Sequence, residues 1–248
     1  MLFEKKMYNI IFIVFIFICA GNAEKINETD GLINLLRRMK RKVTVEANFD
    51  KLIDENLPKI RGSIISSGMD PLELDDTTIP VIGLPGIFKG KISLTDGWLQ
   101  QLSHIERIGN SHLTYSDKKL TIEMNLGWQN LSFDYRYLFE YLLYKRKGNI
   151  HGVVTKADIY FKIMVDFETT EVKLEKVKFK NSGKYDLQFE GHIIDPILNT
   201  VVKVVSNFSK DFITRKLQKI FYSIADLEIK EINKNLKAIL EGYQNIYY

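Results

Sequence analysis

The chain has 248 residues, of which 45% are hydrophobic and 27% are charged. It is therefore too apolar for an intrinsically disordered protein, and long enough to bury a substantial core. Its 35 basic and 31 acidic residues leave a net charge of +4, an excess too small to indicate a nucleic-acid-binding protein. The one cysteine, Cys19, lies near the N-terminus, so the rest of the chain must be stabilised by packing rather than by disulfide bonds.

Residues 1–23 have the pattern of a secretory signal peptide. Lys5 and Lys6 precede an apolar run from Ile10 to Ala20, and small residues follow up to Ala23. A signal anchor that stays attached has the same pattern, although the run is short for a membrane span. We expect cleavage near Ala23 and a secreted, extracellular protein.

A polar and basic leader, residues 24–42, follows the predicted signal peptide. It ends in a basic run from Arg37 to Lys42, and Arg38-Met39-Lys40-Arg41 has the spacing of a paired-basic processing site. The same run fits a solvated helix end, or contact with anionic lipid headgroups, where each basic residue contributes about 1 kcal/mol. Determination of the mature N-terminus would separate these three interpretations.

Three Asn-X-Ser/Thr sequons, at Asn27, Asn130 and Asn207, predict N-linked glycans on a protein that passes through the secretory pathway. Asn27 lies in the polar leader, where an acceptor site is accessible. Asn207 lies inside a long predicted helix, so its modification requires that this helical turn faces solvent.

We expect a single domain over residues 43–248, beginning with a helix from Val43 to Met69. Its apolar residues recur at helical spacing and are Phe49, Leu52, Ile53, Leu57, Ile60, Ile64 and Ile65. Pro58 should kink this helix or divide it in two, and Gly68 should end it. The Pro- and Gly-containing segment from Thr77 to Lys89 is predicted to be a loop.

Strand patterns begin at Lys91. Alternation of apolar and polar residues predicts strands over residues 91–95, 120–127, 131–139, 159–167, 172–179 and 185–189. The alternation changes phase between Leu174 and Val177, which predicts a β-bulge that bends the sheet. Strands with one apolar and one polar face are typical of an antiparallel sheet that packs one face on a core.

The longest predicted element is an amphipathic helix from Asp195 to about Leu240. Asp195 is expected as the N-cap and Pro196 as the first helical residue. The apolar residues at three- and four-residue steps are Ile197, Val201, Val204, Val205, Phe208, Phe212, Ile213, Leu217, Ile220, Phe221 and Ile224. A shorter N-terminal helix, a series of strands and this helix predict an α+β fold, with a strongly curved antiparallel β-sheet wrapped around the long C-terminal α-helix.

The sequence shows no motif for catalysis or metal binding. The histidines His104, His112, His151 and His192 lack the spacing of a zinc site. Neither a G-x-S-x-G pattern nor a phosphate-binding glycine pattern is present. We therefore expect a binding protein without a cofactor, and not an enzyme.

Four segments carry a family resemblance: Met69-Asp70-Pro71-Leu72-Glu73-Leu74, Gly90-Lys91-Ile92-Ser93-Leu94, the predicted strand Leu102-Ser103-His104-Ile105-Glu106-Arg107-Ile108-Gly109, and Ile194-Asp195-Pro196-Ile197-Leu198. In this order they resemble the mite group-seven allergen family, over about Val43 to Leu240. More distantly, the pattern is similar to the insect takeout and juvenile-hormone-binding proteins of the tubular lipid-binding superfamily, which includes bactericidal/permeability-increasing protein. Takeout-type hormone carriers have a cysteine pair near the N-terminus that is missing here, so the resemblance favours the allergen branch.

The resemblance implies one module that holds a lipid-like molecule in an elongated apolar cavity between the sheet and the last helix. The side chains expected to line this cavity are Ile122, Met124, Phe133, Tyr135, Phe161, Ile163, Val201, Val205, Phe208 and Phe212. The same residues are consistent with a packed core that has no cavity.

Three functions stay open on the sequence. The first is a secreted carrier of a lipid or other hydrophobic small molecule, with transient membrane contact and no nucleic-acid partner. The second is an innate-immune binder of anionic membranes or lipopolysaccharide, with Arg37 to Lys42 or Lys173 to Lys180 as the anion-facing surface. The third is an interaction protein that binds no small ligand.

Overall fold

The structure is a computed structural model of the chain. It describes residues 45–47, 50–84, 89–117, 119–166, 168–169, 171–190 and 195–244. The predicted signal peptide, the basic leader and the sequon at Asn27 lie outside these residues, as do the loop at residues 85–88 and His192.

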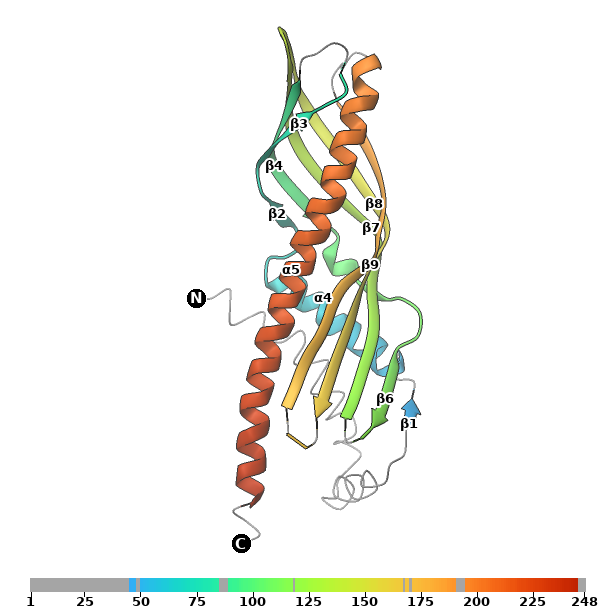
Figure 1. The fold of residues 1–248 in the computed structure, drawn as a ribbon, viewed down its shortest axis with the longest axis vertical. Coiled ribbons are helices and arrows are strands. Elements are labelled where there is room, and N and C mark those ends of the chain that lie inside the picture. The colour runs from blue at the N-terminus through green and yellow to red at the C-terminus, as the bar shows by residue number, and fades with distance from the viewer. Residues whose placement is uncertain are drawn as a thin grey trace.

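Nine strands of the described residues form one antiparallel sheet, against which two helices pack (Figure 1). The strands are β1 (Val45–Ala47), β2 (Leu72–Leu74), β3 (Thr77–Val81), β4 (Gly90–Gln100), β5 (Glu106–Arg107), β6 (His112–Ser116), β7 (Lys119–Tyr141), β8 (Tyr144–Asp166) and β9 (Glu171–Phe189). The helices are α4 (Asp50–Ser66) and α5 (Asp195–Gln244), with a 3-10 turn at Leu102–His104 between β4 and β5.

Strands β7 and β8 form the spine of the molecule. Each has 23 residues, and they pair along their whole length, from Lys119 opposite Asp166 to Tyr141 opposite Tyr144. Strand β9 pairs with the free edge of β8. The other edge of β7 pairs in turn with β6, β5 and β4, and the short strands β1, β2 and β3 lie outside β6 and β4.

Strand β7 joins two strands that the sequence predicted separately, over residues 120–127 and 131–139. Apart from Gly127, buried residues of β7 have even numbers up to Trp128 and odd numbers from Leu131 onward. Strand β8 changes in the same way between Val154 and Ala157, where Lys156 has a φ of 58°. Since side chains alternate in strands, this offset in both strands keeps the apolar side chains on the inner face. The change of phase predicted two strands, but it is an irregularity within one.

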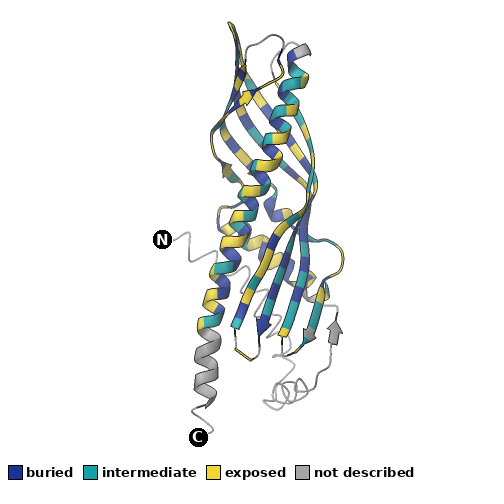
Figure 2. Ribbon diagram, in the orientation of Figure 1, coloured by how far each residue is buried: buried dark blue, intermediate teal, exposed yellow. Residues whose placement is uncertain are grey.

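Helix α5 has a buried row that winds around its axis. The buried residues of this row follow at four-residue steps and are Ile197, Val201, Val205, Ser209, Ile213, Leu217, Phe221, Ala225 and Ile229. Because successive helical residues are rotated by about 100°, each four-residue step turns the row by about 40°. Buried and exposed segments therefore alternate along the helix surface, as Figure 2 shows. A twisted sheet must wind around the helix to cover such a row.

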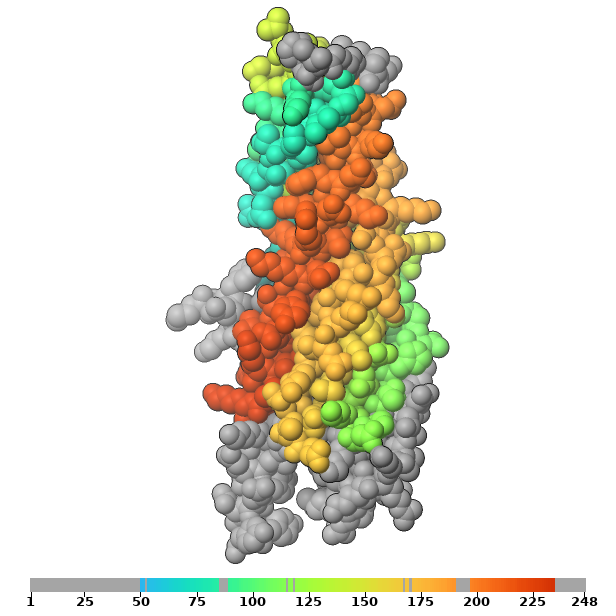
Figure 3. All heavy atoms as spheres, viewed as in Figure 1, coloured from blue at the N-terminus to red at the C-terminus, as the bar shows by residue number. Residues whose placement is uncertain are grey.

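The predicted α+β fold is confirmed. The sheet curves around α5, which contacts β9 on one side and β3 on the other. Figure 3 shows α5 filling the space between these two borders of the sheet. The predicted bulge in β9 is also confirmed, since its pairing with β8 shifts by one residue between Leu174 and Lys176.

The first helix is shorter than predicted and is not divided. It begins at Asp50, whereas β1 lies within the range expected to be helical. It continues through Pro58, because this proline faces solvent and the Asp54 carbonyl, which loses its helical hydrogen bond there, lies on the wet side. It ends as predicted at Gly68, whose φ is 70°, with a hydrogen bond from the Met69 amide to the Ile64 carbonyl.

Two further predictions on local structure were wrong. Residues 77–81, predicted to be a loop, form β3; Pro80 is tolerated there because β3 pairs on one side only, with β4. Residues 102–109, predicted to be a strand, contain the 3-10 turn and only the two-residue strand β5. The Asp195 side chain, predicted as a helix cap, lies outside the described side chains.

The level of Trp128 divides the molecule into two halves. We call the part with β3, β4 and residues 131–154 and 182–189 the hairpin half, and the part with α4, β5, β6 and residues 119–128 and 157–179 the α4 half. Between them, the Trp128 indole nitrogen donates to the Leu102 carbonyl over 2.9 Å, and its ring packs against Phe179 and Phe221.

Candidate ligand-binding site

The α4 half contains an enclosed apolar cavity between the sheet and the two helices. Its volume is about 40 Å³, and the surface that lines it is entirely apolar. It is lined by Ile60, Ile64, Met69, Ile105, Met124, Leu126, Phe161, Ile163, Phe221, Ile224 and Ala225. A cavity of this size holds a water-sized group, whereas ligand pockets typically measure roughly 300–1,000 Å³. This cavity, as the described residues form it, is therefore too small for an acyl chain.

A second hollow, an open groove of about 610 Å³, runs along α5 beside β2 and the end of α4. It is lined by Gly68, Met69, Leu72, Asp75, Phe212, Arg215, Lys216, Lys219, Ile220, Ser223 and Ile224. The apolar members form a floor, and Arg215 and Lys219 are exposed at its rim. Lys216 pairs with Asp75 over 2.9 Å, so the groove keeps an excess of two positive charges. Its volume is within the range of small-molecule sites.

Two side chains separate the groove from the enclosed cavity. Met69 and Ile224 line both spaces, and each is only 3% exposed. Methionine is unbranched and changes rotamer at low cost, so Met69 is the more adaptable part of this partition. Displacement of Met69 would connect a cationic, solvent-exposed groove with an apolar interior space.

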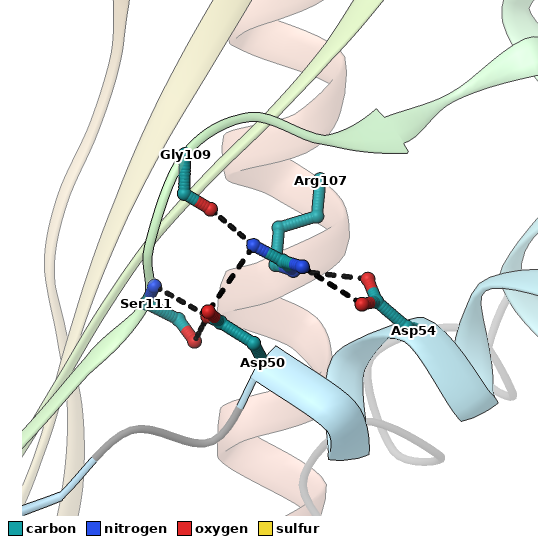
Figure 4. Close-up of polar contacts among 5 residues, drawn as sticks. All are labelled: Asp50, Asp54, Arg107, Gly109 and Ser111. Atoms are coloured by element: carbon teal, nitrogen blue, oxygen red, sulfur yellow. Dashed lines mark hydrogen bonds and ion pairs between the residues drawn. The ribbon is translucent and has the colours of Figure 1, made fainter.

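The position of α4, and with it one wall of the cavity, is fixed by an arginine from the sheet (Figure 4). Arg107 of β5 donates two hydrogen bonds to Asp54, of 2.9 and 2.8 Å, and lies 3.4 Å from Asp50. Asp50 also accepts hydrogen bonds from the amide and hydroxyl groups of Ser111. The hydrogen bond to Asp54 raises the pKa of Arg107 above its ordinary value, so the charge is permanent.

The start of β9 is bound to α5 through the side chain of Asn233. The amide of Asn233 accepts from the Val172 nitrogen over 2.7 Å and donates to the Val172 oxygen over 2.9 Å. The backbone N–H and C=O groups of Val172 thus both bond to this side chain, as they would bond to a residue of a neighbouring strand. This contact attaches the border strand β9 of the sheet to α5.

The hairpin half is filled by aromatic rings that lie over glycines of neighbouring strands. Phe133 covers Gly152 and Tyr135 covers Gly97, so closely that a Cβ atom on either glycine would overlap the ring. Burial raises the pKa of Tyr135, and it raises the pKa of Tyr185, whose ring packs 6.1 Å from that of Phe133, to about 12. Both phenols are therefore neutral fillers, Tyr135 buried and Tyr185 partly buried.

The ten side chains predicted to line a cavity all lie on the inner side of the sheet or against it, but in different surroundings. Met124, Phe161 and Ile163 line the enclosed cavity. Phe212 lines the groove. The others pack in the core or against it, outside the two hollows, and are Ile122, Phe133, Tyr135, Val201, Val205 and Phe208.

Several lining residues were not among those predicted. Ile60 and Ile64 come from α4, and Phe221, Ile224 and Ala225 from the part of α5 beyond the predicted set. The four-residue spacing along α5 predicts their burial. It does not predict which turn of the winding row faces a space, because that depends on how far the sheet has turned at each level.

Two predicted surface features are placed by the structure. Asn130 and Asn207 are exposed, as glycosylation requires. Lys176, Lys178 and Lys180 lie along β9 around an outer hollow of about 440 Å³. Glu123 and Glu175 also line this hollow, and both pair with Lys162, so they partly offset its positive charge.

Two further features, a metal-binding group and a membrane-spanning helix, are not found among the described residues. Across these ranges, His, Cys, Asp and Glu form no group of three suited to a metal ion. Nor does either helix, as far as its residues are described, combine the length and apolarity needed to cross a bilayer.

The sequence matches the group 7 allergen family over residues 48–227, which is most of the chain. This chain belongs to the group 7 allergen family. The resemblance inferred from its four segments is thereby confirmed. Among curated protein sequences, none matches this family member significantly.

A solved structure with a TM-score above 0.5 shows the same fold. The crystal structure of lipopolysaccharide binding protein is similar with a TM-score of 0.52 and 12% identity, over 79% of this chain and 41% of that protein. This group 7 allergen family member thus spans about two fifths of that protein's length. The crystal structure of Takeout 1 from Epiphyas postvittana is matched at 17% identity with a TM-score of 0.33, over 66% of this chain and 77% of that one.

Proposed function

We propose that this protein is a secreted carrier of a lipid-like amphiphile with an anionic or strongly polar head. The observation that carries the proposal is the groove, which has an apolar floor and a cationic rim. Only a thin partition separates this groove from an enclosed apolar space. The protein's part is binding and not catalysis. The family match and the shared fold with lipopolysaccharide binding protein support a hydrophobic ligand.

The two hollows suit the two ends of such a molecule. The head would lie at Arg215 and Lys219, where charge-assisted hydrogen bonds to a phosphate or carboxylate form. The chain would lie along Phe212 and Ile220 and enter the interior when Met69 moves aside. Each buried methylene contributes about 0.8 kcal/mol, so a long chain binds tightly even with few polar contacts.

Native mass spectrometry of the protein purified from secreting cells, followed by solvent extraction, tests this proposal. We expect a bound amphiphile, whose amount falls in Ile220→Gln and in Arg215→Glu with Lys219→Glu. The matched controls are Leu227→Gln and Lys210→Glu, which change exposed residues of α5 outside the lining of the two hollows. A protein that carries no amphiphile, or groove variants that retain as much as the controls, would contradict the proposal.

A second candidate, a binder of anionic membranes or lipopolysaccharide, is favoured by the lysines of β9. Lys176, Lys178 and Lys180 are exposed on one stretch of strand. For this function we expect binding to anionic vesicles that weakens with salt, because exposed charges are screened over about 8 Å at physiological ionic strength. Retention of a ligand after purification in high salt would favour the carrier instead.

A further inference from the structure

The β7–β8 hairpin ends the molecule in a turn of two leucines. Leu142 is 59% exposed and Leu143 is 100% exposed. The hairpin projects at one end of the long axis, where Figure 1 shows the connected ends of β7 and β8. Ile82, 64% exposed, follows Val81, which pairs with Gly90 at the same end of the sheet. Three large apolar side chains are thus exposed at one tip.

These leucines are poorly suited to the turn that they form. A two-residue hairpin turn in which only the first central residue has a positive φ favours glycine at that position. Leu142 has a φ of 54°, a conformation that a leucine adopts only at a cost. A sequence that places leucines there gives up turn stability, and such breaks with local preference concentrate at functional positions.

Basic residues surround the apolar tip. Lys145, Arg146 and Lys147 follow the turn and are exposed, and Arg146 lies 4.5 Å from the centre of the Tyr144 ring. Glu140 accepts ion pairs from Lys91 at 2.8 Å and from Lys145 at 2.7 Å, which hold its pKa down at about 2. Counting Lys91, four cations stand against this one carboxylate.

We propose that this hairpin tip docks the protein on anionic lipid surfaces, with Leu142 and Leu143 in the headgroup–acyl boundary and the basic residues at the phosphates. An apolar projection with a basic collar fits a bilayer with negative surface charge, because the two contributions act at different depths. The inference rests on the proposed carrier function and deepens it. The tip sets the molecule upright on a membrane, at the site where a carrier collects or delivers its ligand.

Vesicle sedimentation with the full secreted chain tests the tip. The central variant is Leu142→Gly with Leu143→Asn, which places glycine at the positive-φ position of the turn and so keeps or raises the urea midpoint. We expect wild type to bind phosphatidylcholine–phosphatidylserine vesicles more tightly than phosphatidylcholine vesicles, and the variant to bind at least tenfold more weakly. Leu227→Gln, at an exposed leucine of α5, is the matched control and should bind as wild type.

The charge arm compares two basic surfaces. Lys145→Gln with Lys147→Gln should weaken binding about twenty-fivefold, at about fivefold per basic residue. Lys176→Gln with Lys178→Gln, on β9, should leave it unchanged. Loss of binding only in the β9 pair, or full binding by the Gly-Asn variant, would overturn the inference.

A second copy of the chain is the other occupant to exclude. Light scattering that finds a wild-type dimer and a monomeric Gly-Asn variant, with equal vesicle binding, would assign the tip to self-association and overturn membrane docking. Extraction of the same samples keeps the two proposals apart. The Gly-Asn variant should retain as much lipid as wild type, while a wild type without lipid would contradict carriage whatever the vesicles show.

Discussion

The hairpin half and the α4 half fill the space between a curved sheet and α5 with different side chains. In the hairpin half, the rings of Phe133 and Tyr135 lie flat on glycines of the neighbouring strands. In the α4 half, isoleucine, leucine and methionine side chains from α4 and the sheet meet α5 around an empty space. Flat rings over glycines close the interior, whereas branched aliphatic chains from three directions leave a gap. On the proposed function, the half that would hold the ligand is the one whose described glycines have no ring packed over them.

The largest expected effect is that of a methyl group added in the hairpin half. Gly152→Ala should lower the free energy of unfolding by about 2 kcal/mol, because the new Cβ overlaps the Phe133 ring and the strand pair must shift. Urea unfolding measures the change.

The matched control for this substitution is Gly62→Ala in α4. Nothing lies within 4 Å of the added Cβ there, so the variant should gain about 0.5–1 kcal/mol from helix propensity. Equal effects of the two substitutions would show that the halves do not differ in packing.

The next effect concerns how the α4 half keeps its cavity wall in place. Arg107→Met leaves Asp50 and Asp54 without their shared cation and should cost about 2 kcal/mol, because these charge-assisted contacts are partly buried. Chemical denaturation gives the difference. Arg136→Met, which removes the exposed ion pair to Asp96, should cost less than about 1 kcal/mol, and a larger loss there would contradict this ranking.

A smaller effect on stability, with a clear effect on binding, is expected from filling the cavity. Ala225→Val adds two methyl groups at the cavity wall, so the change in unfolding free energy should stay within about 1 kcal/mol. Extractable lipid should fall, because the new atoms occupy space for the ligand. Val201→Ile, in the packed hairpin half, should cost more stability without lowering the lipid content; the reverse pattern would place the ligand elsewhere.

The smallest effect is a pH dependence on the outer face of the hairpin half. His151 lies between Asp134 at 2.5 Å and Glu190 at 3.1 Å, and the hydrogen bond to Asp134, followed by that to Glu190, raises its pKa above 6.5. This stabilisation is complete below the unfolded pKa and is lost as the pH rises through the folded pKa. The urea midpoint of wild type should therefore fall between pH 6 and 8.

The His151→Gln variant separates this contribution from other titrations. It removes the titrating imidazole, so its midpoint should fall less over the same pH interval. An identical pH profile in both proteins would show that the contacts of His151 with Asp134 and Glu190 do not contribute to the pH dependence of stability.

Periodicity determined the fold class and the inward side chains of this protein, and four short segments carried the family resemblance. Helical spacing from Ile197 to Ile224 and the alternation around Ile122 and Phe133 report which residues are buried, because burial depends on local period and polarity. Local patterns also located the bulge near Leu174 and the helix end at Gly68. In contrast, the exposed leucines at residues 142 and 143 form no pattern with their neighbours, so their role at the tip escaped prediction.

Only the tertiary structure decided where the interior is packed and where it is hollow. Phe133 and Met124 have the same alternation in the sequence, yet one covers a glycine from the next strand and the other borders a cavity. The difference depends on what faces each side chain from distant parts of the chain, namely Gly152 in one case and Ile60 and Phe221 in the other. Sequence period sets the direction of a side chain, and the winding of the sheet around α5 sets what it meets.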